Sequence, residues 1–336
     1  MSDTAEAGSA PPPGKGSHEP TLLYAGPPDE WPRWQKALER AFAARGLEAR
    51  LVPHPAAAPG TTFSPGKIDV ILYAPTGPVS DFSPFSRLRA VFSLWAGVER
   101  IVTNPTLEVP LTRMVDTGLR QGMAEYVTGH VLRYHLDIDS HILGQDGVWH
   151  HERVPPLARD RQVAILGMGV LGQAVAEMLR PIGFRLLGWS RRPKRIEGVA
   201  MHHGPAGLAA VLGAADIAVA LLPATPETDN LLDASRLALA RPGLRLVNAG
   251  RGNLIDEEAL LAALDEGRIG HATLDVFRTE PLPPDHPFWH HPRITVTPHV
   301  AAETRPETAA PVVADNLARL IAGRPLLHLV DRAAGY

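Results

Sequence analysis

Three polar residues in the C-terminal half of this 336-residue chain carry side chains suited to acid–base and anion chemistry. Arg251 follows the apolar run RLVNAG, Glu280 follows HATLDVFRT, and His299 follows ITVTP. Each run predicts a buried strand, so each polar residue would stand at or just after a strand's carboxyl end, where ligands bind in doubly wound sheets. We therefore expect the three side chains to share one site.

The combination suits the reduction of a 2-oxo acid. The planar guanidinium fork of Arg251 matches the geometry of a substrate carboxylate. His299 titrates near neutral pH and can protonate an alkoxide as it forms. Glu280 would accept a hydrogen bond from the ring nitrogen of His299 that does not face the substrate. This contact would orient the imidazole and keep it protonated to higher pH. Taken singly, the three could be a surface residue, a turn residue and a core histidine, but their order together favours the shared site.

A glycine loop upstream could hold the hydride donor for such a reaction. Residues 162–172, QVAILGMGVLG, run from an apolar strand through G-x-G-x-x-G into a helical pattern. The first glycine would make the tight turn, the second would let the backbone approach a pyrophosphate, and the third would let the helix pack on the strand. The expected cofactor contacts in this loop are Gly167, Met168, Gly169, Val170, Leu171 and Gly172. The competing interpretation is an ordinary strand–helix turn without a ligand.

The next predicted strand ends in LGWSRRPKR (187–195), a basic cluster. At this place NAD-binding proteins carry an acid that holds the ribose hydroxyls. An acid would repel a 2′-phosphate, whereas Ser190, Arg191 and Arg192 could bind it through charge-assisted hydrogen bonds. The cluster therefore predicts NADPH in preference to NADH, and its alternative is a solvated surface loop. Lys194 and Arg195 are assigned to the phosphate less directly, because Pro193 would turn them away from it.

Alternating strands and helices must bring these residues together. From Gln162 on, apolar strands alternate with helices, which predicts a parallel sheet covered on both faces. The N-terminal part has strand patterns at 21–26, 68–74 and 90–99 and a helical pattern at 31–46 that ends at a glycine. A helix at 122–144 would connect the two parts, and a last helix at 303–322 would return to the first. The fold class expected is α/β, with two Rossmann-like, doubly wound parallel-sheet domains.

Composition narrows the range of functions. With 33 Lys and Arg against 36 Asp and Glu, the formal net charge is −3, which gives no general attraction to nucleic acid or to a membrane surface. The lack of cysteine excludes disulfides, thiolate nucleophiles and Cys-ligated metals. Three histidine pairs have no third ligand at helical spacing, so we expect no metal site. With no long apolar run, the sequence predicts a cytoplasmic protein with a disordered tail at residues 1–19.

Five stretches of the sequence together carry a family resemblance. GMGVLG, LLPATPET (221–228), VNAGRG, LDVFRTEPLP and TPHVAAET are together similar to the D-isomer-specific 2-hydroxyacid dehydrogenases, over essentially the whole chain after the tail. The resemblance implies a substrate domain made of residues 20–118 and 303–336. An NAD(P)-binding domain, residues 119–302, would be inserted between these two parts, and a homodimer would form through it.

The resemblance also implies a reaction and further site residues. WAGVE (95–99), DTGLRQGMAEY (116–126), WSRRPK and VDRAAGY are most similar to reductases of small 2-oxo acids. This implies NADPH-dependent conversion of glyoxylate to glycolate and of hydroxypyruvate to D-glycerate, with His299 as proton donor. The substrate carboxylate would bind near Trp95, on the backbone amides of Ala96, Gly97 and Val98, and on Arg251. The remaining implied cofactor contacts are Leu222, Pro223, Asn248, Ala249, Gly250 and, near the nicotinamide, Asp275.

The chain departs from the family pattern at a few positions. WAGVE has Trp95 where a small residue is usual and Glu99 where Asp is usual, and Trp95 would narrow the pocket in favour of small substrates. Gly250 replaces the usual Ala or Ser. Two alternatives stay open: a reductase of larger acids such as phenylpyruvate or branched-chain 2-oxo acids, and a non-enzymatic NAD(P)-sensing module similar to corepressors. The intact Arg251, Glu280 and His299 count against the second.

Overall fold

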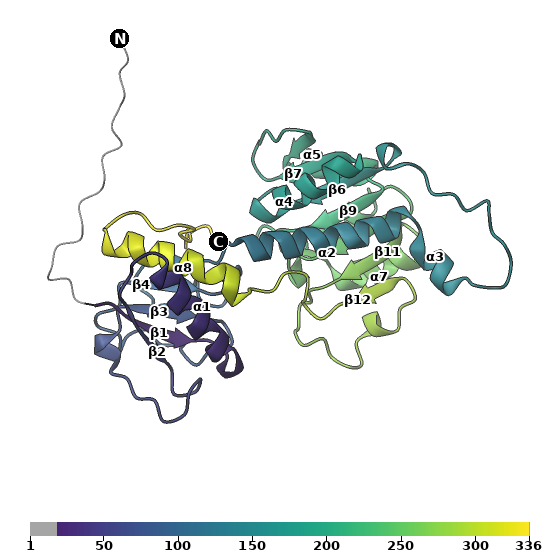
Figure 1. Cartoon of the computed structure of the whole chain (residues 1–336). Coiled ribbons are helices and arrows are strands. Elements are labelled where there is room, and N and C mark those ends of the chain that lie inside the picture. The colour runs from purple at the N-terminus through teal and green to yellow at the C-terminus, as the bar shows by residue number, and fades with distance from the viewer. Residues whose placement is uncertain (1–18, 336) are drawn as a thin grey trace, which may run out of the picture.

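The first of two parallel sheets is built from short, buried N-terminal strands. In the computed structural model, which describes residues 19–335, its strand order is β2-β1-β3-β4-β5 (Figure 1). The bounds are β1 Thr21–Ala25, β2 Arg50–Pro53, β3 Val70–Tyr73, β4 Ala90–Ser93 and β5 Leu111–Thr112. This is a doubly wound order in which the chain starts inside the sheet and builds outward in both directions. The expected tail, apart from its last residue, lies outside the described residues.

Two helices distant in sequence cover one face of this sheet. Helix α1 (Trp31–Ala43) and helix α8 (Pro306–Ile321) pack against each other and are drawn side by side, in purple and yellow, in Figure 1. The apolar stripe of α1 recurs at helical spacing and meets apolar residues of α8 in one core: Trp34, Leu38, Phe42, Ala310, Val313 and Leu317. The last helix therefore returns to the N-terminal sheet, as the sequence predicted.

The second sheet has seven parallel strands in the order β12-β11-β10-β9-β6-β7-β8. The bounds are β6 Gln162–Leu166, β7 Arg185–Ser190, β8 Val199–His203, β9 Ile217–Ala220, β10 Leu244–Asn248, β11 Ile269–Leu274 and β12 Ile294–Val296. From β6 the chain first builds outward to β8 and then crosses to β9 on the other side. The strand order reverses between β6 and β9, and ligands bind beside such a switch point, outside the carboxyl ends of the strands.

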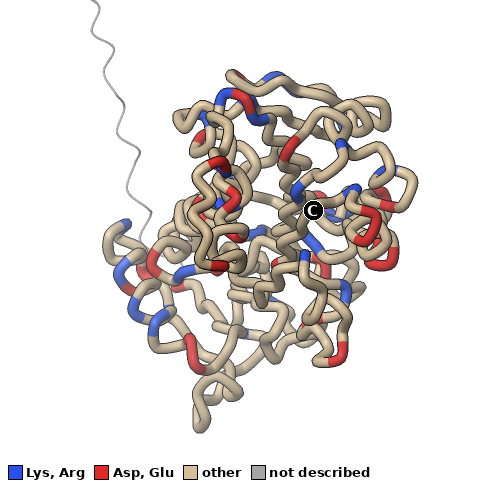
Figure 2. The backbone as a smooth tube through the Cα atoms, turned by 90° about the vertical axis from the view of Figure 1, so that its right-hand side faces the viewer, with Lys and Arg blue, Asp and Glu red and all other residues tan. Residues whose placement is uncertain are grey.

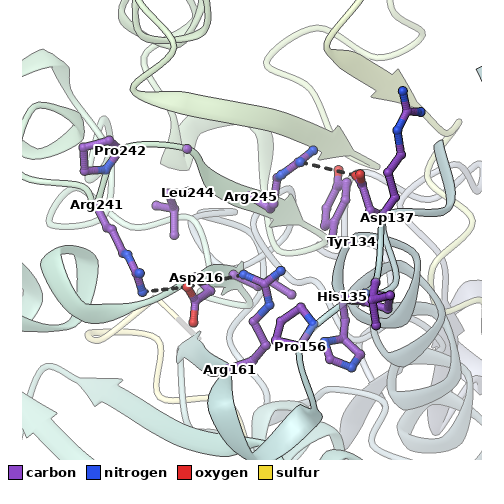
Figure 3. Close-up of a pocket in the computed structure, with 15 residues that line it drawn as sticks. Tyr134, His135, Asp137, Pro156, Arg161, Asp216, Arg241, Pro242, Leu244 and Arg245 are labelled. Carbon is purple, nitrogen blue, oxygen red and sulfur yellow. Dashed lines mark hydrogen bonds and ion pairs between the residues drawn. The ribbon is translucent and has the colours of Figure 1, made fainter. Parts of the chain in front are cut away.

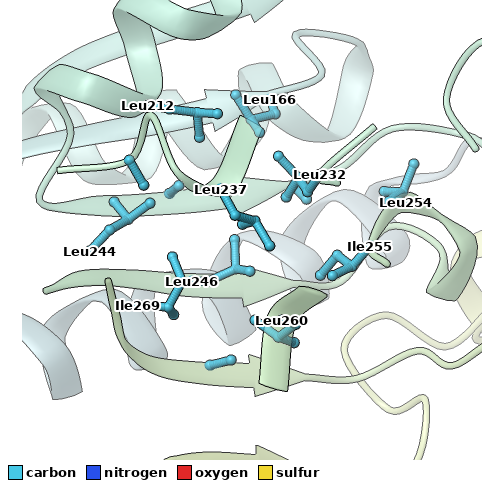
Figure 4. Close-up of a cluster of buried hydrophobic side chains, with 14 of the residues drawn as sticks. Leu166, Leu212, Leu232, Leu237, Leu244, Leu246, Leu254, Ile255, Leu260 and Ile269 are labelled. Carbon is cyan, nitrogen blue, oxygen red and sulfur yellow. The ribbon is translucent and has the colours of Figure 1, made fainter. Parts of the chain in front are cut away.

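Helices on both faces bury the second sheet. Helices α2 (Thr117–His135) and α4 (Val170–Leu179) cover one face. Helices α5 (Gly204–Ala214), α6 (Ala234–Leu237) and α7 (Glu257–Asp265) cover the other, over a cluster of leucines and isoleucines that interdigitate with the strands (Figure 4). Both sheets match the predicted α/β fold class.

Several element predictions need correction. The helix expected at 122–144 begins earlier, because the Asp116 carboxylate accepts hydrogen bonds from the N–H groups of Gly118 and Leu119 and caps α2. It ends at His135, since Asp137 takes a left-handed conformation (φ 50°), and a separate helix α3 follows at Ile138–Leu143. Helix α1 ends at Ala43, three residues before the glycine that was expected to end it.

Three strands escaped prediction because they are short and lie toward the sheet edges. Strands β2, β5 and β8 contain few fully buried apolar residues or only two residues in all, so they lack the continuous apolar run of a central strand. Short 3-10 helices complete the structure: η1 Pro28–Glu30, η2 Pro65–Lys67, η3 Ala158–Asp160, η4 Arg180–Ile182, η5 Gly252–Leu254 and η6 Pro287–Trp289.

Charged residues of both signs are interspersed along the chain. Figure 2 shows Lys and Arg beside Asp and Glu in many segments. Among the helices of residues 19–335, none combines the length and the apolar character that crossing a membrane would require.

Candidate active site

His299 and Glu280 form a hydrogen-bonded pair beyond the carboxyl ends of β11 and β12. The Nδ1 atom of His299 lies 2.8 Å from Oε2 of Glu280. The other carboxylate oxygen, Oε1, accepts the backbone N–H of Phe277 at 2.9 Å, which fixes the carboxylate. With Nδ1–H donating to Glu280, the second ring nitrogen, Nε2, carries a transferable proton when the ring is in its imidazolium form.

The pairing changes the acidity of both partners. The hydrogen bond to Glu280, assisted by the charge of that carboxylate, raises the pKa of His299 against the opposing effects of burial and of the Arg251 charge. For Glu280, burial acts to raise the pKa, but the hydrogen bonds from His299 and from the Phe277 N–H outweigh it, and the pKa is lowered. The pair therefore favours an imidazolium beside a carboxylate, the state that a proton donor needs.

Asp275 holds the segment that carries His299. Its side chain is 1% exposed, and its Oδ1 accepts hydrogen bonds from the Thr297 hydroxyl at 2.6 Å and the Val300 N–H at 2.9 Å. Its Oδ2 accepts the N–H of Ala301 at 2.9 Å. These bonds hold the left-handed backbone of His299 (φ 55°), which is unfavourable by about 1–2 kcal/mol for a residue with a Cβ. These contacts are with the segment that carries His299, and the expected place of Asp275 near the nicotinamide stays a prediction.

Arg251 connects the two sheets at the same place. It follows β10, and its Nε donates to Oε1 of Glu99 at 2.8 Å, with Nη2 at 3.4 Å from Oε2. Glu99 belongs to the loop after β4 of the first sheet, 152 residues away in the chain. The positive charge of Arg251 also acts to lower the pKa of His299.

The loop after β4 presents free backbone donors beside Arg251. The N–H groups of Ala96, Gly97 and Val98 donate no hydrogen bond to protein atoms among the described residues. A Cβ on Gly97 would overlap Nη2 of Arg251, so the loop lies directly against the guanidinium. Val98 is buried, whereas Trp95, at the start of the same loop, is 38% exposed.

The glycine loop after β6 has the geometry of a phosphate cradle. Gly167 has a φ of 108°, and a Cβ there would lie 2.7 Å from the carbonyl oxygen of Leu221, the residue after β9. A Cβ on Gly172 would overlap the carbonyl oxygen of Gly167, so helix and loop are in direct contact. A Cβ on Gly169 would meet no atom within 4 Å, so this position is open to a ligand.

The start of α4 completes a fit to a dinucleotide. Gly169 caps the helix without a side-chain hydrogen bond, and the first helical amide to donate is that of Gln173, to the Gly169 carbonyl at 3.0 Å. The N–H groups of Val170 and Leu171 are therefore available to a phosphate, aided by the partial positive charge of the helix N-terminus. These features suit the pyrophosphate of a nicotinamide dinucleotide.

The basic cluster lies against the glycine loop. Nζ of Lys194 donates to the Met168 carbonyl at 2.9 Å, which places this side chain against the glycine loop. The Ser190 hydroxyl donates to the carbonyl of Arg192 at 2.7 Å and so shapes the turn. Nη1 of Arg191 lies 3.9 Å from a carboxylate oxygen of Glu227, an acidic neighbour that no sequence pattern indicated.

The other predicted cofactor residues surround the same loop. Leu222 contacts the glycine loop, since its Cδ2 would lie 3.2 Å from a Cβ on Gly167, and Pro223 follows it. The buried Asn248 accepts the N–H of Gly250 at 3.2 Å and donates to the Arg251 carbonyl at 3.0 Å, which shapes the turn through Ala249 and Gly250. A Cβ on Gly250 would lie 2.9 Å from the Leu222 carbonyl oxygen, so glycine suits this turn.

A separate polar cavity of about 420 Å³ lies at the opposite edge of the second sheet. It is lined by residues that precede β6, β9 and β10 and by the end of α2 (Figure 3). Asp216 organises it, with Arg241 at 2.6 Å and Arg161 at 3.6 Å. None of the catalytic candidates lines this cavity.

Comparison with known proteins identifies the family. The profile described as D-isomer specific 2-hydroxyacid dehydrogenase, NAD binding domain, matches residues 130–301, about half of the chain. The chain belongs to the D-isomer-specific 2-hydroxyacid dehydrogenase family. Among curated proteins, this dehydrogenase is 44% identical over 259 residues to the glyoxylate/hydroxypyruvate reductase A of Serratia proteamaculans (strain 568). The match covers 74% of this chain and 82% of that protein.

Solved structures give the same family. A D-isomer specific 2-hydroxyacid dehydrogenase from Xanthobacter autotrophicus Py2, in complex with NADPH and MES, is 38% identical, with a TM-score of 0.88 over 95% of this chain and 100% of that one. An NADPH-dependent glyoxylate/hydroxypyruvate reductase from Sinorhizobium meliloti, in complex with NADP and sulfate, is 36% identical. Its TM-score is 0.82, over 95% of this chain and 100% of that one. The architecture of this dehydrogenase is thus that of enzymes solved with the phosphorylated dinucleotide.

Proposed function

We propose that this dehydrogenase uses NADPH to reduce glyoxylate to glycolate and hydroxypyruvate to D-glycerate. The observation that carries the proposal is that Arg251, the His299–Glu280 pair and the glycine loop all follow strands of the second sheet at the edge of their carboxyl ends, with the free amides of the loop after β4 against Arg251. In the reaction, the carbonyl carbon gains a hydride and the carbonyl oxygen gains a proton. A 2-oxo acid thereby becomes the corresponding 2-hydroxy acid.

Each residue of the site has a separate role in the proposed reaction. Arg251 and the N–H groups of Ala96 and Gly97 bind the substrate carboxylate and set the carbonyl before His299. His299, protonated at Nε2, gives its proton to the carbonyl oxygen as negative charge develops there. Glu280 holds the imidazole through Nδ1 and stabilises its protonated form. NADPH, when bound, supplies the hydride.

The basic cluster supports the phosphorylated cofactor. Arg191 and Arg192 stand at the end of β7, where an acid would otherwise select NADH. Lys194 anchors this turn to the glycine loop and adds a third positive charge. Two relatives were solved with NADPH or NADP, which is consistent with this assignment.

A steady-state panel tests the function directly. We expect NADPH-dependent turnover of glyoxylate and hydroxypyruvate with kcat/KM at least about tenfold above that for phenylpyruvate, because Trp95 is expected to narrow the pocket. Pyruvate provides the comparison of intermediate size, and every substrate is measured with both cofactors by the loss of reduced-nicotinamide absorbance. A higher kcat/KM for phenylpyruvate would favour the larger-substrate alternative. No turnover of any 2-oxo acid would favour the NAD(P)-sensing module.

We further propose that the chain forms a homodimer through the segment around α3. Three apolar side chains there are largely exposed: Leu143 by 79%, Trp149 by 88% and Val154 by 78%. Exposed apolar side chains gathered in one segment mark an interaction surface.

The cytoplasmic location expected from the sequence stays a prediction.

Light scattering after size exclusion measures this assembly. We expect the mass of two chains for the wild type and of one chain for the double variant Trp149→Asp, Val154→Asp. Burying two such side chains contributes about 3–6 kcal/mol, so the dimer dissociation constant should rise by at least about 100-fold. Leu239→Asp, which alters an exposed apolar residue elsewhere in the second sheet's domain, serves as the control and should leave the mass unchanged. A monomeric wild type would contradict the proposal.

A further inference from the structure

The ion pair between Arg251 and Glu99 accounts for most of the hydrogen bonds of the catalytic arginine. A guanidinium carries five N–H donors. In Arg251 the Nε and Nη2 atoms each donate to one oxygen of the Glu99 carboxylate, and Nη1 donates to the carbonyl of Gly250 at 2.7 Å. One N–H on each terminal nitrogen is left, and such a pair of donors suits a carboxylate.

We propose that Glu99 is a positioning residue, which holds Arg251 so that its two remaining terminal N–H groups face the substrate carboxylate. The inference rests on the proposed function and adds a residue that touches neither the substrate nor the cofactor. Arginine side chains have several rotatable bonds, and fixing one of them before binding removes an entropic cost from the binding step. A two-oxygen contact fixes both the direction and the plane of the guanidinium.

The loop between β4 and Glu99 is shaped for this contact. A Cβ on Gly97 would overlap Nη2 of Arg251 and lie 2.7 Å from Oε2 of Glu99, so only glycine lets loop and ion pair approach this closely. Val98 anchors the loop in the core of the first sheet with 2% exposure. Glu99 and Arg251 are themselves about one-third exposed, so the pair is open to the site rather than sealed in a core. The loop thus supplies both the free amides and the carboxylate that orients the arginine.

The pair also adjusts the charge that His299 experiences. The groups that set the pKa of His299 are Glu280 and Asp275, which raise it, and Arg251, which lowers it. A carboxylate bound to Arg251 offsets part of the arginine's charge. Without Glu99, the uncompensated arginine would lower the pKa of His299 further.

Three variants separate geometry from charge. Glu99→Gln keeps one acceptor oxygen but removes the charge, and Glu99→Asp keeps the charge but shortens the reach. The control is Asp315→Asn on helix α8, which removes the carboxylate that lies 2.6 Å from Nε of another arginine, Arg45. Circular dichroism and thermal unfolding establish that each variant is folded.

Binding of oxalate, an unreactive dicarboxylate, is measured by calorimetry on protein saturated with NADP⁺. We expect the dissociation constant to rise about tenfold in Glu99→Gln and by a smaller factor in Glu99→Asp, with no change in Asp315→Asn. In kinetics, the KM for glyoxylate should rise in parallel while kcat and the KM for NADPH change little. The basic limb of the kcat/KM profile should move to lower pH in Glu99→Gln and stay in place in Glu99→Asp.

The outcomes distinguish this inference from the proposed function. If the wild type reduces no 2-oxo acid but oxalate binding weakens as expected, the proposed reaction fails and the positioning role stands. An oxalate affinity in Glu99→Gln within twofold of the wild type, or higher than it, would overturn the positioning role. Oxalate that binds the wild type no better than it binds Arg251→Ala would overturn it as well.

Discussion

Replacing His299 with asparagine is expected to lower kcat for glyoxylate reduction by about 10²–10⁴, the range typical for loss of a general acid. Asparagine tolerates the left-handed backbone at this position, where φ is 55°, so the fold is retained. The dissociation constant for NADPH, measured by fluorescence titration, should remain within about twofold of the wild type. A kcat near that of the wild type would require another proton donor.

The pH dependence of the same reaction tests the partner of His299. Reduction needs the protonated imidazole, so activity should fall as the pH rises through the pKa of His299, which its hydrogen bond to Glu280 raises. In Glu280→Gln that pKa should drop, and the basic limb of kcat/KM should move to lower pH. Asp285→Asn, an exposed carboxylate in the same β11–β12 connection, is the matched control. An unmoved limb in Glu280→Gln would show that Glu280 does not act on His299.

Exchanging the charges at the end of β7 is expected to reverse the cofactor preference. In the double variant Arg191→Glu, Arg192→Ala, the ratio of kcat/KM for NADPH to that for NADH should fall by at least about 100-fold. The reason is that each charge-assisted hydrogen bond contributes about 1.5–3 kcal/mol. Glutamate also introduces the acid that normally binds the ribose hydroxyls of NADH.

Two further variants give this experiment its controls. Arg195→Ala removes one positive charge from the same cluster but beyond Lys194, and should change the ratio by less than about threefold. Glu227→Gln removes the carboxylate 3.9 Å from Arg191 and should shift the ratio modestly toward NADPH. An unchanged ratio in the double variant would mean that the basic cluster does not bind the 2′-phosphate.

The sequence by itself determined the fold class and the order of the candidate residues. Buried parallel strands are recognisable as apolar runs, and ligand-binding residues stand at their carboxyl ends. This is why Arg251, Glu280 and His299 could be assigned to one site, and why the glycine loop could be placed before α4. Such signals are local, since each depends on a few neighbouring residues and the regular geometry of strand and helix. The sheet-edge strands β2, β5 and β8 carry too few buried apolar residues to give that signal.

Only the tertiary structure decided which side chains fix these residues in place. Glu99 meets Arg251 across 152 positions in the chain. Asp275 holds the backbone that carries His299, and Lys194 reaches back to Met168. Each contact depends on how two sheets and their connecting loops pack as a whole, and not on the residues beside it in the chain. The residue types that do chemistry are therefore visible in the sequence, whereas the long-range contacts that fix Arg251 and the backbone of His299 appear only when the chain is folded.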